Sequence, residues 1–242
     1  MPFDQRDAAC RCEWGPRGLV ALAPADVVIV VDTLSFSTCV DVAVGRGAAI
    51  FPYAWRDATA ADFAAGRRAI LAGPRGGGGY SLSPASFRDA PRDLRCVLPS
   101  PNGAALALRA HAMGVHVLAG CLRNAPAVAA AALRRGRTFN VCPAGERWPD
   151  GSLRPALEDW LAAGAILRHL PGPKSPEAAA AVVAFEGSRD RLAKVLADAG
   201  SGRELIARGY AIDVEVAAEH AVSEHAPRFD GEAFVAEQAG GL

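Results

Sequence analysis

The run "VVIVV" at residues 27–31 is the feature that most limits what this chain can fold into. Five consecutive β-branched residues are too few for a helix and offer solvent no polar side. This pattern is typical of a strand buried on both faces of a parallel sheet. The run ends on Asp32, and Ser35, Ser37 and Thr38 follow shortly after. We therefore expect a buried strand whose carboxyl end carries a carboxylate and a cluster of hydroxyl groups.

Apolar runs and helical patterns alternate along the rest of the chain, and residues 74–84 form a loop because four consecutive glycines cannot hold an element. This alternation predicts an α/β fold, a layered α/β/α arrangement around a mostly parallel sheet. Further strands are expected at 48–54, 70–73, 95–103 (ending in a turn), 115–120 and 138–145, and helices at 38–46, 57–69, 104–113, 125–136, 156–170, 175–187, 189–198 and 201–208.

A chain of 242 residues can bury a substantial core, so we predict one unit over 1–242 with a flexible N-terminal segment of about residues 1–12. Two strand–helix–strand segments share a plan, with Leu34 matching Leu122 and Arg46-Gly47 matching Arg135-Gly136. This match suggests two similar halves, 13–114 and 115–242. The alternative is that any two such units look alike in an alanine-rich chain.

Charge and hydropathy argue against two classes of partner. Lys plus Arg and Asp plus Glu both number 26, and no block of like charge occurs, so neither nucleic acid nor an anionic membrane surface is expected as a partner. No apolar run reaches the ~18 residues needed to span a bilayer. The polar N-terminus does not resemble a secretory signal, so a cytoplasmic location with reduced thiols is expected.

The six cysteines do not indicate a structural zinc site. Cys39, Cys96, Cys121 and Cys142 each stand alone in apolar or small-residue surroundings, where free cysteine usually serves as a small buried apolar residue. The Cys10-x-Cys12 pair lies in the segment expected to be mobile, and no second pair follows at zinc-site spacing.

Polar side chains follow four of the predicted strands. Ligands of open parallel sheets bind beyond the carboxyl ends of the strands, so these positions are candidates for a site. Ordinary caps and turns explain part of the pattern, and Ser37 and Asn124 in particular are typical N-caps. They explain Asp32 less well, because a carboxylate there suits a divalent metal or a general base. The candidates are Asp32, Ser35, Ser37, Thr38, Asn102, Gly103, Arg123, Asn124, Gly145 and Glu146.

The helix expected from residue 156 brings two adjacent carboxylates, Glu158 and Asp159. On a helix they point about 100° apart, so one can face a site while the other faces elsewhere. Alternatively, both only complement the helix dipole in the first turn. Neither a P-loop nor a G-x-G-x-x-G turn occurs, and the five histidines are scattered. A small phosphorylated or carboxylated ligand therefore fits better than a nucleotide.

Motifs in a fixed order along residues 13–234 resemble the 2-phosphosulfolactate phosphatases, the ComB-like proteins. They are "EWG", "VVIVVDTLSFST", "LAGPRGG", "SLSPASF", "LPSPNGAAL", "VLAGCLRNAPAVA", "VCPAGE", "ALEDWLAAGAI" and "SGRELIARGYAIDVEVA". The resemblance implies an α/β, Mg²⁺-dependent phosphatase acting on 2-phospho-3-sulfolactate or a related small phosphorylated organic acid. A homodimer is a further expectation, from the family and the alanine-rich helices.

The resemblance also implies roles for particular residues. Asp32, Glu158 and Asn102 would be catalytic, and Asp32 and Asp159 would hold Mg²⁺. Carboxylates with Mg²⁺ suit phosphomonoester hydrolysis, because the ion neutralises the phosphate. Substrate contacts would come from Ser35, Ser37, Thr38, Gly103, Arg123, Asn124 and Glu146.

Several family positions differ in this chain. Ser35 stands where the family usually has an arginine, Pro74 where it has a glutamate and Leu82 where it has an asparagine. Arginine is the natural bidentate partner of phosphate or sulfonate, and Arg75 or Arg123 are the candidates to replace it. Two functions therefore stay open, a phosphatase with a diverged substrate and a non-catalytic binder of a small anionic metabolite on the same scaffold.

Overall fold

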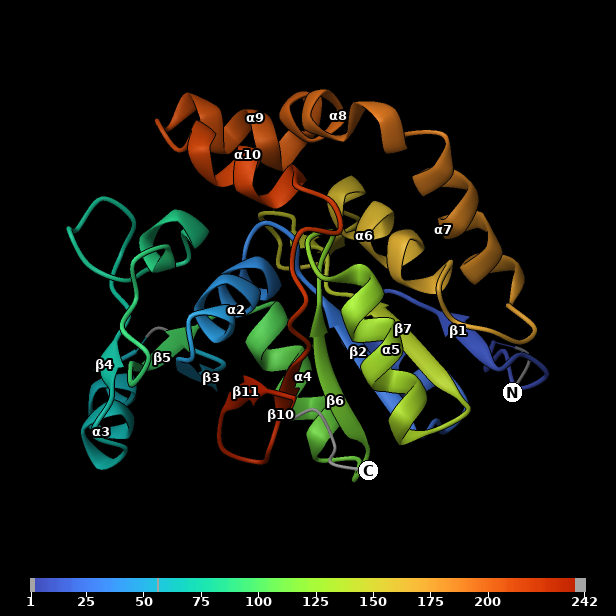
Figure 1. Ribbon diagram of the computed structural model, residues 1–242, viewed down its shortest axis with the longest axis horizontal. Coiled ribbons are helices and arrows are strands. Elements are labelled where there is room, and N and C mark those ends of the chain that lie inside the picture. The colour runs from blue at the N-terminus through green and yellow to red at the C-terminus, as the bar shows by residue number, and fades with distance from the viewer. Residues whose placement is uncertain (1–2, 56, 238–242) are drawn as a thin grey trace.

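The computed structural model describes residues 3–55 and 57–237. These residues form a nine-stranded sheet with helices on both faces (Figure 1). Its strands, in spatial order, are β1 (Cys10–Cys12), β7 (Phe139–Pro143), β2 (Val27–Val31), β6 (His116–Gly120), β10 (Pro227–Phe229), β11 (Phe234–Ala236), β3 (Ala49–Tyr53), β5 (Arg95–Pro99) and β4 (Ile70–Leu71). The predicted α/β fold with a mostly parallel sheet is confirmed.

The strand β2 lies between β6 and β7 and is parallel to both. Every one of its residues is buried, as the continuous apolar run predicts. Val27, Ile29 and Val31 belong to the core on one face of the sheet, and Val28 and Val30 to the core on the other. This alternation is the signature of a strand covered by helices on both sides.

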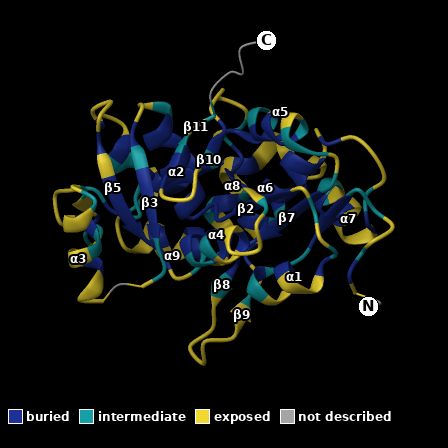
Figure 2. Ribbon diagram, turned by 90° about the horizontal axis from the view of Figure 1, so that it is seen from below, coloured by how far each residue is buried: buried dark blue, intermediate teal, exposed yellow. Residues whose placement is uncertain are grey.

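Helices cover both faces and so complete the three layers (Figures 1 and 2). One core receives side chains from α5 (Ala125–Arg135), α6 (Leu157–Leu167), α7 (Pro176–Glu186), α8 (Leu192–Asp198), α9 (Gly200–Ala207) and α10 (Ala211–Ala218). The other core receives them from α1 (Gly15–Ala21), α2 (Phe36–Gly45), α4 (Gly103–His111) and the 3₁₀ turn η1 (Pro84–Phe87). A smaller core lies under α3 (Thr59–Gly66), and a second 3₁₀ turn, η2 (Arg189–Arg191), precedes α8.

The antiparallel hairpin β10–β11 divides the sheet into two parallel blocks. β6 pairs antiparallel with β10, β10 with β11, and β11 with β3. Three such steps reverse direction, so β3, β4 and β5 run against β2, β6 and β7. Although the two blocks run in opposite directions, the segment after β5 reaches the end of β2, where the N–H of Gly103 bonds to the carboxylate of Asp32.

Several sequence expectations need correction. Residues 10–12 are not flexible, because they form the buried strand β1 paired with β7. Cys10 and Cys12 are therefore core residues, and all six cysteines are buried and free. The helix α1 and the hairpins β10–β11 and β8 (Glu146–Arg147) with β9 (Leu153–Arg154) were not predicted. The remaining predicted helices and strands are confirmed, with bounds shifted by a few residues.

Strands from the two predicted halves alternate in the sheet, since β2 of the first half lies between β6 and β7 of the second. The pseudo-repeat itself stays a prediction. In the described part of the chain, no helix is both long and apolar enough to cross a bilayer.

The packing of α6 on α7 depends on a glycine. A Cβ atom placed on Gly164 would lie 2.0 Å from the carbonyl oxygen of Ala181, a backbone atom that cannot move without displacing α7. The Gly164→Ala change should therefore lower the free energy of unfolding by about 1–3 kcal/mol, the usual cost of overpacking. Urea denaturation measures this loss. Gly66→Ala in α3 is the matched control, because nothing lies within 4 Å of its added Cβ. Equal stability of the two variants would contradict this packing.

Candidate functional site

Asp32 lies where the N-termini of α2 and α4 meet. Its Oδ1 accepts a hydrogen bond from the backbone N–H of Phe36 at 3.1 Å, and its Oδ2 accepts one from the N–H of Gly103 at 2.8 Å. The hydroxyl of Ser100 is 3.4 Å from the same Oδ2. A side chain at position 103 would bring its Cβ to 2.6 Å from Oδ2, so this approach requires glycine. The carboxylate thus joins the two helix N-termini, where negative charge is favourable.

Asp159, in the first turn of α6, joins two other loops. Its Oδ1 accepts the N–H of Thr33 at 2.7 Å, and its Oδ2 accepts the N–H of Gly145 at 2.9 Å. Gly145 has a φ of +67°, and a Cβ there would lie 2.8 Å from Leu153, so glycine is required. Both carboxylate oxygens of Asp159 are therefore fixed by backbone donors from the ends of β2 and β7.

Glu158 differs from its neighbour. It is only 2% exposed, yet within the described residues no hydrogen bond or ion pair reaches its carboxylate. Of the two adjacent acids, Asp159 is held by the backbone and Glu158 is open to a ligand, as their divergent directions on a helix allow.

Glu146, in β8, is the fourth acid of the group. The Nδ2 of Asn102 donates a hydrogen bond to its Oε2 at 3.0 Å. Burial raises the pKa of Glu146 to about 7, and the negative charges of Asp32 and Glu158 add to the rise. The hydrogen bond from Asn102 opposes this shift because it favours the ionised form.

The four acids share one electrostatic environment. Burial raises the pKa of Asp32 and that of Asp159, and the charge on Glu158 raises both further. In the described parts of the chain, no ion pair with lysine, arginine or histidine involves any of these four carboxylates. A buried group of acids without a cationic partner is costly, so the site is arranged to receive positive charge.

The hydroxyl cluster after β2 is mostly used within its own turn. Ser37 accepts the N–H of Asp32 and donates to the carbonyl of Val30, while the Thr38 hydroxyl donates to the carbonyl of Thr33 at 2.7 Å. Ser35 alone among the three predicted hydroxyls contacts a distant segment. Its Oγ accepts a hydrogen bond from Nη2 of Arg75 at 2.6 Å.

Two predicted substrate contacts lie elsewhere. The Asn124 side chain is fully buried and closes its own loop, accepting from the N–H of Cys121 and donating to the carbonyl of Ala119. Arg123 lines a different pocket of about 430 Å³, where its Nε donates to Asp41 at 2.8 Å and its guanidinium also pairs with Glu219. The structure therefore does not bring Asn124 or Arg123 to the four carboxylates.

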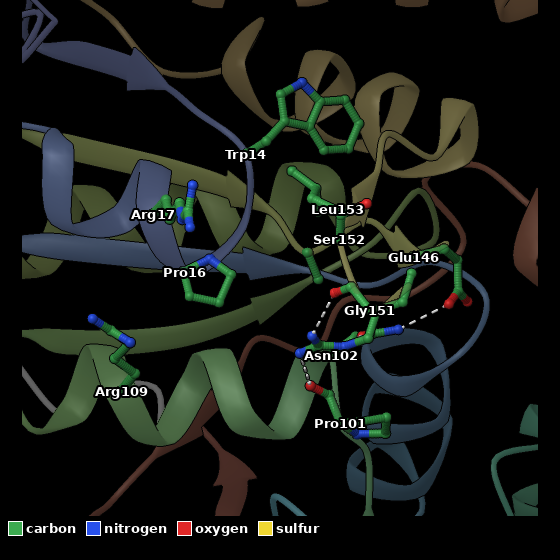
Figure 3. A pocket seen from close by; sticks show the side chains of 12 residues that line it. Trp14, Pro16, Arg17, Pro101, Asn102, Arg109, Glu146, Gly151, Ser152 and Leu153 are labelled. Carbon is green, nitrogen blue, oxygen red and sulfur yellow. Dashed lines mark hydrogen bonds between the residues drawn. The ribbon is translucent and has the colours of Figure 1, made fainter. Parts of the chain in front are cut away.

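A pocket of about 410 Å³ opens beside Glu146 and Asn102 (Figure 3). Arg17 and Arg109 lie on the opposite side of it from Glu146, so the pocket has a cationic end and a carboxylate end. Arg147 also lines it and donates to the Oδ1 of Asn102 at 3.3 Å. Trp14 forms part of the apolar wall and stacks on Trp160, with ring centroids 5.4 Å apart.

Sequence reasoning missed the arginines of this pocket. Arg17 and Arg109 are isolated on α1 and α4, and nothing in the local pattern separates them from other surface arginines. Thr33 was missed as well, although its place next to Asp32 was a usable signal, since its N–H fixes Asp159.

The donor set fits a hard divalent cation, because every candidate ligand is a carboxylate oxygen and none of the four carboxylates forms an ion pair within the described residues. Within the described residues, no three Asp, Glu, His or Cys side chains are placed to hold one ion together. Mg²⁺ commonly needs only one or two carboxylates, with water and substrate phosphate completing its shell. The open Glu158 and the neighbouring Asp32 match that requirement.

The raised pKa of Glu146 predicts a stability effect with a definite sign. Between pH 4.5 and about 7 the folded chain holds a proton on Glu146 that the unfolded chain has lost, so stability falls as pH rises. Glu146→Gln should therefore stabilise the protein at pH 8, by on the order of 1–3 kcal/mol, and have little effect at pH 4. Urea unfolding of both proteins at the two pH values tests this. A difference that does not depend on pH would contradict the raised pKa.

Comparison with known proteins agrees with the motifs in the sequence. The sequence model of the family described as 2-phosphosulpholactate phosphatase matches residues 17–232, which is most of the chain and includes all four carboxylates of the site. No curated protein sequence matches the chain closely enough to count as a relative. The chain belongs to the 2-phosphosulpholactate phosphatase family.

Proposed function

We propose that this protein is a phosphatase that hydrolyses the phosphate ester of a small organic acid, 2-phospho-3-sulfolactate or a related compound. The observation that carries the proposal is a group of four carboxylates, none paired with a cation in the described residues, of which Glu146 lines a pocket that has arginines at its far end. Such a site offers acids to a metal ion and to proton transfer, and guanidinium groups to an anion. Membership of the family supports the same reaction.

The pocket fits a small substrate with two anionic ends. Its volume of about 410 Å³ lies at the low end of ordinary ligand sites. The phosphate would lie at the end of Glu146 and Asn102, close to the other carboxylates. The acid group of the substrate would lie against Arg17 and Arg109, which can bind carboxylate or sulfonate through paired N–H donors.

We infer that Mg²⁺ is the cofactor and that Glu158 and Asp32 hold it. When bound, the ion would neutralise charge on the phosphate and act as a Lewis acid there. Asp159 fixes the loops after β2 and β7 through backbone hydrogen bonds to both of its oxygens. Asp32 also accepts backbone hydrogen bonds on both oxygens, and a carboxylate oxygen that accepts one such bond keeps a further acceptor position with which it can contact an ion.

The protein's own side chains can supply the proton transfers. Water attacks phosphorus and the bond from phosphorus to the ester oxygen breaks, while Glu158 accepts the proton of the water. Glu146, held by Asn102, donates its proton to the departing alkoxide. A carboxylic acid with a pKa of about 7 carries a proton in much of the population at neutral pH, so Glu146 suits this part. Inorganic phosphate and the free hydroxy acid are the products.

The experiment is phosphate release from 2-phospho-3-sulfolactate and a panel of phosphorylated hydroxy acids, each with Mg²⁺ and with EDTA. Wild type should turn over at least one compound, and only with Mg²⁺. Glu158→Gln should lose about 10²-fold or more in kcat, because this change removes a base and a ligand without breaking a hydrogen bond within the protein. Asp32→Asn should lose activity as well.

Glu177→Gln is the matched control, since Glu177 is also an acid in the first turn of a helix but is exposed on α7. It should keep full activity. No turnover of any compound by folded wild type, together with measurable binding of phosphate, would contradict the phosphatase and favour a non-catalytic binder of small anions. The homodimer and the cytoplasmic location stay predictions.

A further inference from the structure

We propose that Arg75 is a further substrate-binding residue, whose guanidinium lies beside the loop that follows Asp32, and that Asp213 holds this guanidinium in position. This inference rests on the proposed function and extends the site to two segments, the glycine-rich loop 74–79 and the helix α10. Neither segment lies on the pocket of Figure 3.

The first argument is where the guanidinium lies. Its Nη2 donates to Ser35 at 2.6 Å, three residues along the chain from Asp32. Ser35 is the N-cap of α2, and the next residue, Phe36, donates its N–H to Asp32, so the guanidinium and the Asp32 carboxylate both lie at the N-terminus of α2. Arg75 is thus a cation beside the set of four carboxylates, none of which forms an ion pair within the described residues.

The second argument is how firmly the side chain is held. Nε of Arg75 donates to Oδ2 of Asp213 at 3.2 Å, and Asp213 is wholly buried. The other oxygen of Asp213 accepts the hydroxyl of Ser83 at 2.5 Å, and the ring of Tyr210 packs against the guanidinium at 5.7 Å. A buried carboxylate fixed on both oxygens orients the guanidinium at little further loss of entropy.

The third argument is what the guanidinium leaves free. Nε and Nη2 have partners, whereas no acceptor within the described residues bonds to Nη1. Nη1 is not enclosed by the protein, and the Arg75 side chain is 16% exposed, so this nitrogen is accessible to solvent. A phosphate oxygen can accept from Nη1, and a second oxygen can take over the Nη2 donor from Ser35, giving a bidentate contact.

The fourth argument concerns the loop. Gly76 and Gly78 have φ values of +81° and +77°, which other residues rarely adopt. Their conformation returns the chain from Arg75 toward Tyr80, where the N–H of Gly73 bonds to the carbonyl of Tyr80 at 2.8 Å. The glycines therefore serve to present Arg75 at the site.

The chain offers a matched control with the same geometry. Arg123 donates from Nε to Asp41, and Asp41 also accepts the hydroxyl of Ser223 at 2.7 Å. The arginine side chains are equally exposed, at 15% and 16%, and both aspartates are enclosed. This second trio lies in the other pocket and does not contact the loop after Asp32. Substitutions in this second trio show what the loss of a buried ion pair does to the protein in general. Any further loss of phosphate binding in the Arg75 and Asp213 variants is then specific to the site.

The test is calorimetric titration with inorganic phosphate in the presence of Mg²⁺, with circular dichroism to verify folding. Arg75→Ala should weaken phosphate binding about 10- to 100-fold, the range for losing a charge-assisted hydrogen-bond pair. Asp213→Asn should weaken it by a smaller factor, because the guanidinium remains but is no longer fixed. Asp41→Asn should change it less than twofold. Added guanidinium ion should restore part of the binding of Arg75→Ala, which a purely structural loss would not allow.

The outcomes separate this inference from the proposed function. If wild type hydrolyses a substrate and Arg75→Ala keeps both its KM and its phosphate affinity, Arg75 does not bind substrate while the phosphatase stands. If Asp41→Asn weakens binding as much as Asp213→Asn, the positioning role of Asp213 is wrong. If wild type neither hydrolyses the panel nor binds phosphate, the proposed function fails and this inference fails with it.

Discussion

The carboxylate of Asp32 is the contact on which the site depends, because it joins the two oppositely directed blocks of the sheet. It follows β2 of one block and accepts the N–H of Gly103, which follows β5 of the other. A second N–H, from Phe36, fixes its remaining oxygen. Without this junction, Asn102, next to Gly103, would lose its direct link to the loop after β2, and the pocket wall that Pro101 and Asn102 form would be held less firmly.

The structure divides the work between the acids by their hydrogen bonds. Asp32 and Asp159 accept backbone donors and join the loops after β2, β5 and β7, while Glu158 has no hydrogen-bond partner for its carboxylate within the described residues and Glu146 has Asn102. Burial and the neighbouring negative charges raise the pKa of three of them, so the crowding of negative charge is unfavourable here. A cation and an anionic substrate together would relieve it, and this is the physical basis for proposing metal-assisted phosphate hydrolysis.

Sequence reasoning predicted what depends on local pattern. The apolar run before Asp32 predicted β2, and the adjacent Glu158 and Asp159 were predicted to point in different directions from one helix. It could not see that Arg123 belongs to another pocket, because the partner Asp41 lies 82 positions away in the chain. The strands β10 and β11 were missed because each has three residues and is stabilised by neighbours from distant segments. An isolated arginine such as Arg17 cannot be assigned to a binding site from the sequence, because only the fold brings it to the pocket.

The most direct test of the central claim is to locate a phosphate mimic and a metal in crystals of the protein. Crystals soaked with tungstate and Mn²⁺ would show both by anomalous scattering. The account predicts manganese at Glu158 and Asp32, and tungstate beside it at the edge of the sheet near Asn102 and Glu146. Tungstate bound only in the pocket of Arg123, or manganese absent from the carboxylates, would contradict a phosphate-ester site at this edge.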